Sequence, residues 1–442
     1  MPPTSPFAIP NFRAYWLARF ATTLGQMAMV IVIGWQVYDI ARQTMSVRDS
    51  AFQLGLIGVA QFLPLLVLSL YAGWVADRID RRWIARAAVT LELGCAAALA
   101  MLTLTGNISL PWLFFIAGLL GVARAFAGPA LGALAPNLVP KEILPKAIAM
   151  SALAWQSASI LGPALGGYLY AGADWLAYAV SSALFGVAVI LLFMIGPVPR
   201  STIDDTQGPW AQMVDGLRYV RRNRLVLGAI SLDLFAVLLG GATAMLPVYA
   251  RDILQVGADG LGHLRAAPAV GAVAVAAWFG MRPLKTNVGV KMLWAVAAFG
   301  AATVVFGLSV WLTAPIFGAS AVGSDWAPAV LVALVALFLV GAADMISVYV
   351  RQSLIQLHTP DAMRGRVGAV STLFISGSNE LGEAESGFLA AAVGPVAAVV
   401  GGGMAAIGVT LLWARLFPEL RQARTFEPPA EPISVPAQPQ PS

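Results

Sequence analysis

Apolar residues dominate this chain in long, nearly uninterrupted runs. Each run has roughly 20 residues, enough to cross a hydrocarbon core about 30 Å thick. The expected spans lie near residues 15–40, 52–76, 83–105, 110–135, 146–170, 174–196, 225–250, 259–281, 290–313, 326–351, 367–393 and 396–417. Helices satisfy their own backbone polar groups in lipid, whereas open strands do not. The pattern therefore predicts an all-α membrane protein with about twelve transmembrane helices.

The composition and charge placement agree with a membrane location. The 442 residues are 59% hydrophobic and 11% charged, whereas soluble domains carry about 25% charged residues. The net charge of +5 raises the alternative of a nucleic-acid partner, but the basic residues are distributed unevenly between the two sets of loops. One set holds only Arg42, Arg48, Arg251 and Arg265. The positive-inside rule then places both termini in the cytoplasm and predicts an inner-membrane protein without nucleic-acid contacts.

Cysteine and histidine are too scarce for redox or metal chemistry. Cys95 is the single cysteine, and the two histidines, His263 and His358, fall in separate connecting segments. Disulfides within one chain and thiolate metal sites are thereby excluded. We expect no cofactor, no metal site and no enzymatic activity. The full length of the first apolar run also argues against a cleavable signal peptide.

The spans divide into two sets of six around a polar segment. We expect a cytoplasmic tail at 1–13, a six-helix bundle at 14–196, a linker at 197–224, a second bundle at 225–418 and a Pro-rich disordered tail at 419–442. An internal repeat supports this division, because "VPKEILPKAIAMSALAWQSASILGPALGG" aligns with "TPDAMRGRVGAVSTLFISGSNELGEAESG". Two parallel six-helix repeats predict a pseudo-symmetric transporter with a central site exposed alternately to each side.

The linker contains an amphipathic stretch from Trp210. Met213, Leu217 and Val220 recur at helical spacing, opposite a row of basic residues, Arg218, Arg221, Arg222 and Arg224. Such a helix is typical of one lying on an anionic leaflet. A simple connector between the two bundles is an equally good interpretation.

The connection between the second and third spans reads "GWVADRIDRR". It resembles the loop signature of the major facilitator superfamily at every defining position, and the signature residues are Gly73, Asp77, Arg78, Arg81 and Arg82. The resemblance implies that Asp77 holds the N-terminal end of the eleventh helix and closes the cytoplasmic side. The arginines would serve as its ion-pair partners, or simply as topology anchors. The corresponding segment of the second half, "GMRPLKTNVGVK", keeps cationic residues without the Asp-Arg pair.

Two further motifs resemble elements of the same superfamily. In the fourth span Arg124 precedes Gly128 by four residues, and an arginine at this depth is functional unless it snorkels to the surface. In the fifth span "SASILGPALGG" resembles the core of the motif of proton-coupled exporters, through Gly162, Pro163, Gly166 and Gly167. The motif's leading glycine is Ala158 here. Glycine and proline there bend the helix and permit close packing.

Within the superfamily the chain is similar to the enterobactin-exporter-like group. The resemblance rests on "FRAYWLARF", "GWQVYDI", "GLRYVRRN", "LDLFAVLLGGATAMLPVYARDIL" and "RQSLIQLHTPDAMRGRV", which are distributed over the whole chain. It implies efflux of a siderophore or of hydrophobic drugs by antiport with protons, by a protein that is usually a monomer. The expected partners are therefore a small-molecule substrate, protons and the lipid bilayer.

Polar and charged residues inside the spans are the candidates for the substrate and proton pathway, because such residues are expensive in lipid. They are Gln26, Gln36, Asp39, Glu92, Arg124, Asp233, Asp344, Arg351, Glu380 and Glu383. In the resembled fold, helices one, four, seven and ten line the central cavity, which favours Gln26, Gln36, Arg124, Asp233 and Asp344 as lining residues. Burial favours the neutral form of a carboxylate, which suits proton coupling.

The stretch "SNELGEAESG" places three glutamates within an apolar span. Glu380 and Glu383 share one helix face, and Glu385 is turned away from it. The first pair either faces the opposite half and takes part in coupling or gating, or satisfies polar partners within its own bundle. Glu385 is expected to be structural.

Three functional hypotheses remain from the sequence. The first is proton-driven export of a small organic molecule by alternating access. The second is import of a metabolite by the same fold. The third is a membrane enzyme or a non-transporting sensor, which the short loops and isolated histidines disfavour. Substrate identity and the proton-carrying carboxylate are left open, because fold does not determine function.

Overall fold

The computed structural model describes residues 5–197, 209–282 and 284–426, and within these ranges it leaves out some side chains, among them those of Asp77, Arg78 and Glu380. The first half consists of η1 (Pro6–Ala8), α1 (Pro10–Ala41), α2 (Val47–Arg78), α3 (Arg81–Leu104), α4 (Leu110–Leu134), η2 (Ala135–Asn137), η3 (Lys141–Ile143), α5 (Leu144–Gly172) and α6 (Leu176–Met194). All of these elements are helical.

The second half begins with the amphipathic helix α7 and ends with the short α16. It contains α7 (Pro209–Arg222), α8 (Arg224–Leu239), η4 (Ala242–Met245), α9 (Leu246–Val248), the π-helix η5 (Tyr249–Ile253), α10 (Gly257–Met281), α11 (Val288–Gly307), α12 (Ser309–Phe317), η6 (Gly318–Ala321), α13 (Pro328–Leu357), α14 (Asp361–Val393), α15 (Pro395–Leu416) and α16 (Pro418–Gln422).

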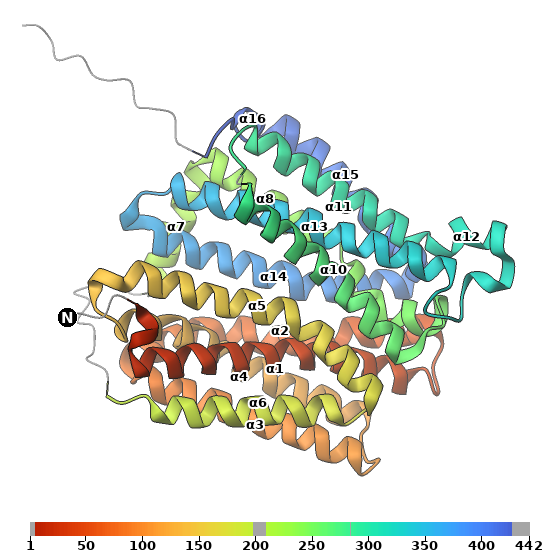
Figure 1. Ribbon diagram of the computed structural model, residues 1–442, viewed down its shortest axis with the longest axis horizontal. Coiled ribbons are helices and arrows are strands. Elements are labelled where there is room, and N and C mark those ends of the chain that lie inside the picture. Colours follow the sequence, from red (N-terminus) through yellow and green to blue (C-terminus); the bar gives the residue numbers. More distant parts are fainter. Residues whose placement is uncertain (1–4, 198–208, 283, 427–442) are drawn as a thin grey trace, which may run out of the picture.

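The long helices lie roughly side by side, with α1–α6 forming one layer of the molecule and α8–α15 the other (Figure 1). We call the end at which α1 begins and α15 ends the terminal end, and the opposite end, beyond which α12 projects, the far end. Large buried side chains, among them Tyr15, Tyr178 and Phe185, fill the core of the first half. The second half has its own core around Met292, Val350 and Leu354.

Eleven helices of the described residues are long and apolar enough to cross a membrane. The helix α14 is not among them, although its 33 residues suffice by length, and its sequence carries three glutamates and two arginines. The expected span pattern is thus confirmed at the level of about twelve helices. One detail is wrong: the span expected over 290–313 ends at Gly307, and the chain starts the separate helix α12 at Ser309. Glycine is a weak helix former, which favours a break there.

The seventh span is discontinuous. The helix α8 ends at Leu239, and after Gly240 and Gly241 the chain continues through a 3₁₀ turn and a π-helical turn to Ile253. The two glycines permit this break and also close packing, because a Cβ added at Gly241 would lie 2.9 Å from the carbonyl oxygen of Gly382. Interrupted spans of this kind line the sites of many transporters.

The helix α7 packs against the second half. Val220 is buried, and Gly216 lies against the backbone of Arg366 on α14. The Tyr219 hydroxyl donates a hydrogen bond of 2.7 Å to the carbonyl oxygen of His358. Leu217 is exposed, so the amphipathic helix both connects the halves and presents an apolar side chain to its surroundings.

The expected tails are partly packed. Pro6 and Phe12 are buried near the start of α1, and Leu420 is buried within α16. Residues 419–426 of the expected C-terminal tail therefore belong to the folded chain. Residues 427–442, which hold all of its prolines, lie outside the described residues.

Glycines bring α5 into close contact with helices of both halves. Cβ atoms added at Gly162 and Gly166 would lie 2.5 and 2.6 Å from atoms of Met27 and Ala28 on α1. One added at Gly167 would lie 2.8 Å from Gly262 Cα on α10 of the other half. The three glycines of the motif therefore pack three helices together, which fits the motif's expected role as a packing element.

We expect Gly167→Val to prevent the close approach of α5 and α10 at the far end while leaving each half folded. Transport should fall by at least about tenfold, because the added side chain would meet the backbone of α10, which can move away only if the two halves separate. Flux by the purified variant in liposomes checks this. Gly94→Ala on α3, where an added Cβ meets nothing within 4 Å, is the control and should transport normally. Equal flux in both variants would contradict the packing role.

Candidate functional site

A buried polar cluster lies within the first half. Gln26 on α1 donates a 2.5 Å hydrogen bond to Glu92 on α3, and Arg124 on α4 is close enough to act on the charge of Glu92. Glu92 is fully buried. A buried carboxylate needs such partners, because an isolated charge in an apolar medium is costly. Three residues that were predicted separately from the sequence thus form one group.

Gln36 does not line a space between the halves. Its side chain is buried within the first half, where it donates to Thr103 Oγ1 at 3.2 Å and accepts from the Tyr178 hydroxyl at 2.8 Å. Both partners belong to the same six helices. The expectation that Gln36 faces a central cavity is therefore wrong, and the residue connects α1, α3 and α6.

The second half contains a buried ion pair between Asp233 on α8 and Arg351 on α13, and the two side chains are 6% and 4% exposed. Asp344 lies two helical turns before Arg351, and therefore on the same side of α13. Asp233, Asp344 and Ser347 border a small cavity between α8, α11 and α13. Its free volume of about 10 Å³ is close to what one water molecule requires.

The glutamates of α14 have different surroundings. Glu383 lies near enough to the partly buried Arg265 of α10 to act on its charge, and both residues belong to the second half. Glu385 is half-buried, and one of its oxygens has no hydrogen-bond partner among the described residues. The side chain of Glu380 lies outside the described ones. Of the two alternatives from the sequence, the interaction of Glu383 with Arg265 fits a polar partner within its own bundle.

Two ion pairs join the halves at the far end. Arg42 contacts Asp252 at 3.0 Å, and Arg251 contacts Asp39. The Tyr38 hydroxyl also donates a 2.5 Å hydrogen bond to Asp252. Each half thus supplies one acid and one base, so the two pairs are reciprocal. Together they hold the far end closed in this conformation.

Apolar residues of both halves surround these ion pairs, and we call these apolar residues the far-end cluster. The first half contributes Ile31, Trp35, Tyr38, Ala51 and Leu54, and the second half contributes residues that include Met245, Tyr249, Leu254, Leu261 and Leu264. At the same end Gly55 on α2 and Gly387 on α14 meet, and a Cβ added at Gly387 would lie 2.4 Å from Gly55 Cα. The pairs are therefore one part of a continuous contact between halves.

The signature loop between α2 and α3 is described only in part. The structure does not describe the surroundings of Gly73, Asp77 and Arg78. The expected contact of Asp77 with the N-terminal end of α14 therefore stays a prediction. Arg82 pairs with Asp80 at 2.6 Å and also donates to the carbonyl oxygen of Ile195, beyond the end of α6. The Arg82 side chain therefore connects this loop to the end of the first half.

The hydrogen bond from the Arg82 guanidinium holds the pKa of Asp80 below its usual range. A depressed folded-state pKa adds stability above the unfolded-state value near 4, and that contribution disappears as the pH falls through the lowered pKa. We expect Asp80→Asn to lower the midpoint of thermal unfolding at pH 7. At pH 3 the difference in midpoint between the variant and wild type should be smaller. Unfolding scans at both pH values check this, and a gap that widens in acid would contradict it.

Sequence inspection missed several residues of these groups. Arg86 is buried and donates to the carbonyl oxygens of Leu192 and Ile195, so it caps the C-terminal end of α6. Tyr38 and Asp252 were not singled out, although the opposite charges of Arg42 and Asp252, both expected near the same membrane surface, were a usable signal. Arg265 was assigned to a loop, whereas it lies partly buried within α10.

The chain matches the family model described as transmembrane secretion effector over residues 1–430. The chain belongs to this family of major facilitator transporters. It is 28% identical to the enterobactin exporter EntS of Citrobacter koseri over 434 residues, which cover 97% of this chain and 96% of the relative. It is 27% identical to the enterobactin exporter of Escherichia coli O1:K1 over 426 residues, which cover 95% and 94% of the two chains.

Solved structures share the fold at low sequence identity. A D-xylose–proton symporter superimposes with a TM-score of 0.70 at 14% identity, covering 93% of this chain and 98% of that one. The inward-open xylose transporter XylE of Escherichia coli gives a TM-score of 0.65 at 14% identity, with coverage of 92% and 96%. The major facilitator fold and a non-enzymatic transport role follow for this family member. A small-molecule substrate and a multi-pass membrane location follow as well.

Proposed function

We propose that this transporter is a proton-driven exporter of a small organic molecule that works by alternating access in the cell inner membrane. Enterobactin or a related siderophore is the first substrate to test. Export and this substrate are supported by the similarity to enterobactin exporters, which align with nearly the whole chain. Proton coupling is supported by the charged residues buried in the spans, and above all by one pair.

The observation that carries the coupling is the buried Asp233–Arg351 ion pair. Opposite charges attract strongly where water is excluded, and either charge alone is expensive there. A proton bound by Asp233 removes one of the two charges, so the Arg351 guanidinium loses its partner. The pair is thereby a two-state element whose preferred arrangement depends on one proton, as a coupled transporter needs.

Asp344 supplies a second proton-binding group beside the pair. It borders the same small cavity as Asp233, together with Ser347. A cavity of this size, with carboxylate and hydroxyl groups in its lining, has the volume and polar partners that one water molecule requires. This shared cavity supports exchange of a proton between the two carboxylates. Glu92, held by Gln26 and close to Arg124, is the corresponding group of the first half.

Substrate and direction are tested by flux into everted membrane vesicles that contain the overproduced chain. With enterobactin outside, we expect accumulation when the vesicle interior is acidified, and collapse of that accumulation when a protonophore dissipates the gradient. Vesicles without the protein are the control. Flux that ignores the gradient would overturn the coupling, and gradient-driven movement in the opposite direction would establish import, the competing function.

A further inference from the structure

A long groove runs over the surface of the second half, along the seam between α11 and α13, with a volume of about 900 Å³. Its floor is made of alanines that are almost fully buried, Ala295, Ala302, Ala336 and Ala343. Its walls are exposed side chains, with Trp294 72% and Val335 61% exposed. Small residues below and large exposed residues above create a trough that faces the surroundings of the helix bundle.

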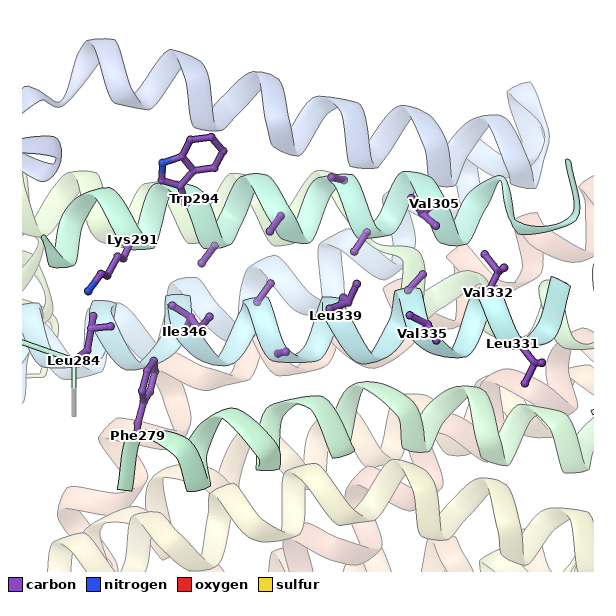
Figure 2. A pocket seen from close by; sticks show the side chains of 17 residues that line it. Phe279, Leu284, Lys291, Trp294, Val305, Leu331, Val332, Val335, Leu339 and Ile346 are labelled. Carbon is purple, nitrogen blue, oxygen red and sulfur yellow. The ribbon is translucent and has the colours of Figure 1, made fainter. Parts of the chain in front are cut away.

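The lining of the groove is hydrocarbon along its length and charged at one end. Figure 2 shows side chains of α11 and α13 facing one another, with Lys291, Leu284 and Phe279 at one end and Val305, Val332 and Leu331 at the other. Lys291 is the single charged residue among those described as lining it. The lipid chains around a spanning bundle are equally apolar, so an occupant of the trough needs an apolar body.

The charged end of the groove belongs to a larger basic cluster. Arg282, Lys285 and Lys291 are all exposed around the connection between α10 and α11. No ion pair joins any of the three to a described residue, and the sequence has no carboxylate from Gly260 to Ser324. This is the segment that corresponds to the signature loop of the first half but lacks its Asp-Arg pair.

The dimensions suit one lipid chain. Lys291 and Val305 are 14 positions apart on α11, which corresponds to about 21 Å along a helix. One leaflet of a bilayer has roughly 15 Å of hydrocarbon depth, half of the full core. A volume near 900 Å³ is also in the range of sites that hold small organic ligands, about 300–1,000 Å³.

We propose that this groove binds an anionic phospholipid, with an acyl chain along the α11–α13 seam and the headgroup phosphate against Arg282, Lys285 and Lys291. A negatively charged head joined to a long apolar chain complements both parts of the site. Arg282 lies over the Trp278 ring, but a neutral transmembrane helix in the trough would leave all three cations without a counter-charge. The anionic surface of the leaflet supplies such lipids in quantity, and each nearby basic residue adds to their attraction.

The test uses the detergent-solubilised full-length chain and native mass spectrometry with added phosphatidylglycerol or phosphatidylcholine. We expect phosphatidylglycerol adducts on wild type at concentrations where phosphatidylcholine gives few. A triple variant should bind phosphatidylglycerol at least about tenfold more weakly. It combines Arg282→Gln, Lys285→Gln and Lys291→Gln. The matched control removes three exposed arginines at the same end, Arg415→Gln, Arg421→Gln and Arg424→Gln, and should bind it as wild type does.

A second variant tests the acyl-chain part independently of charge. Ala298→Phe and Ala301→Phe place bulk in the groove at exposed positions, where folding should be unaffected. Phosphatidylglycerol binding should fall several-fold, and Ala97→Phe on α3, also exposed, should leave it unchanged. Equal binding of the two lipids, an equal loss in the arginine control, or full binding by the groove-filled variant would overturn the proposal. A dimer in place of the lipid adduct would also overturn it.

Discussion

Replacing Asp233 by asparagine is expected to cause the largest loss of both stability and coupled transport. The substitution leaves the Arg351 guanidinium buried at 4% exposure without its counter-charge. Breaking one side of a buried pair costs about 3–5 kcal/mol in the free energy of unfolding. Gradient-driven flux should fall to the background level, because the proton-binding group of the pair is gone.

A double variant separates the structural effect from the functional one. Asp233→Asn with Arg351→Gln removes both charges, so most of the thermal stability in detergent should return. Proton-driven flux should stay absent, because the remaining amides do not titrate. Asp259→Asn, at an exposed position near the start of α10, is the control and should resemble wild type. Full coupled flux by the Asp233 variant would show that this carboxylate is structural.

Reversing the charge of Asp252 is expected to open the far end. Asp252→Arg removes the ion pair with Arg42 and the hydrogen bond from Tyr38, and places a third guanidinium beside Arg42 and Arg251. Like charges at this distance repel, and the far-end cluster loses the contacts that align it. A roughly tenfold shift toward open conformations corresponds to about 1.4 kcal/mol, the scale of one hydrogen bond to a charged group.

Thiol labelling at the far-end cluster measures this shift. The single cysteine, Cys95, is replaced by serine, and Ala51→Cys introduces a thiol at a position that is fully buried when the far end is closed. A membrane-impermeant reagent applied from the far-end side should react about tenfold faster in the Asp252→Arg background. Adding Arg42→Asp restores an opposite-charge pair, so labelling should slow again. No change in rate on charge reversal would show that the ion pairs do not control closure.

The fold was largely predictable from the sequence because membrane spans leave a simple signal. A run of about twenty apolar residues is long enough to cross the bilayer, and only a helix satisfies its backbone polar groups there. The exceptions arise where a local feature interrupts the run. The break after Gly307 and the discontinuity at Gly240 and Gly241 lie inside apolar stretches, so hydropathy alone does not locate them.

The candidate site was predictable in its members and much less so in its pairings. Glu92, Arg124, Asp233 and Arg351 stood out because charges in spans are rare. Their partners depend on how the helices are rotated, which packing determines rather than sequence spacing. Gln36 illustrates the limit, because it was expected to face a cavity and is buried against Thr103 and Tyr178. The far-end pairs were missed for a related reason, since they join the end of α1 to η5, which are distant in sequence.

Proton movement coupled to substrate is the most direct test of the proposed mechanism. Purified protein in liposomes, with a pH-sensitive dye inside and no imposed gradient, is mixed with enterobactin added outside. Inward movement of substrate should be accompanied by outward movement of protons, so the interior becomes alkaline in wild type. The Asp233→Asn, Arg351→Gln variant should show no such change. Substrate movement without any pH change in wild type, or an equal pH change in the variant, would contradict coupling through this pair.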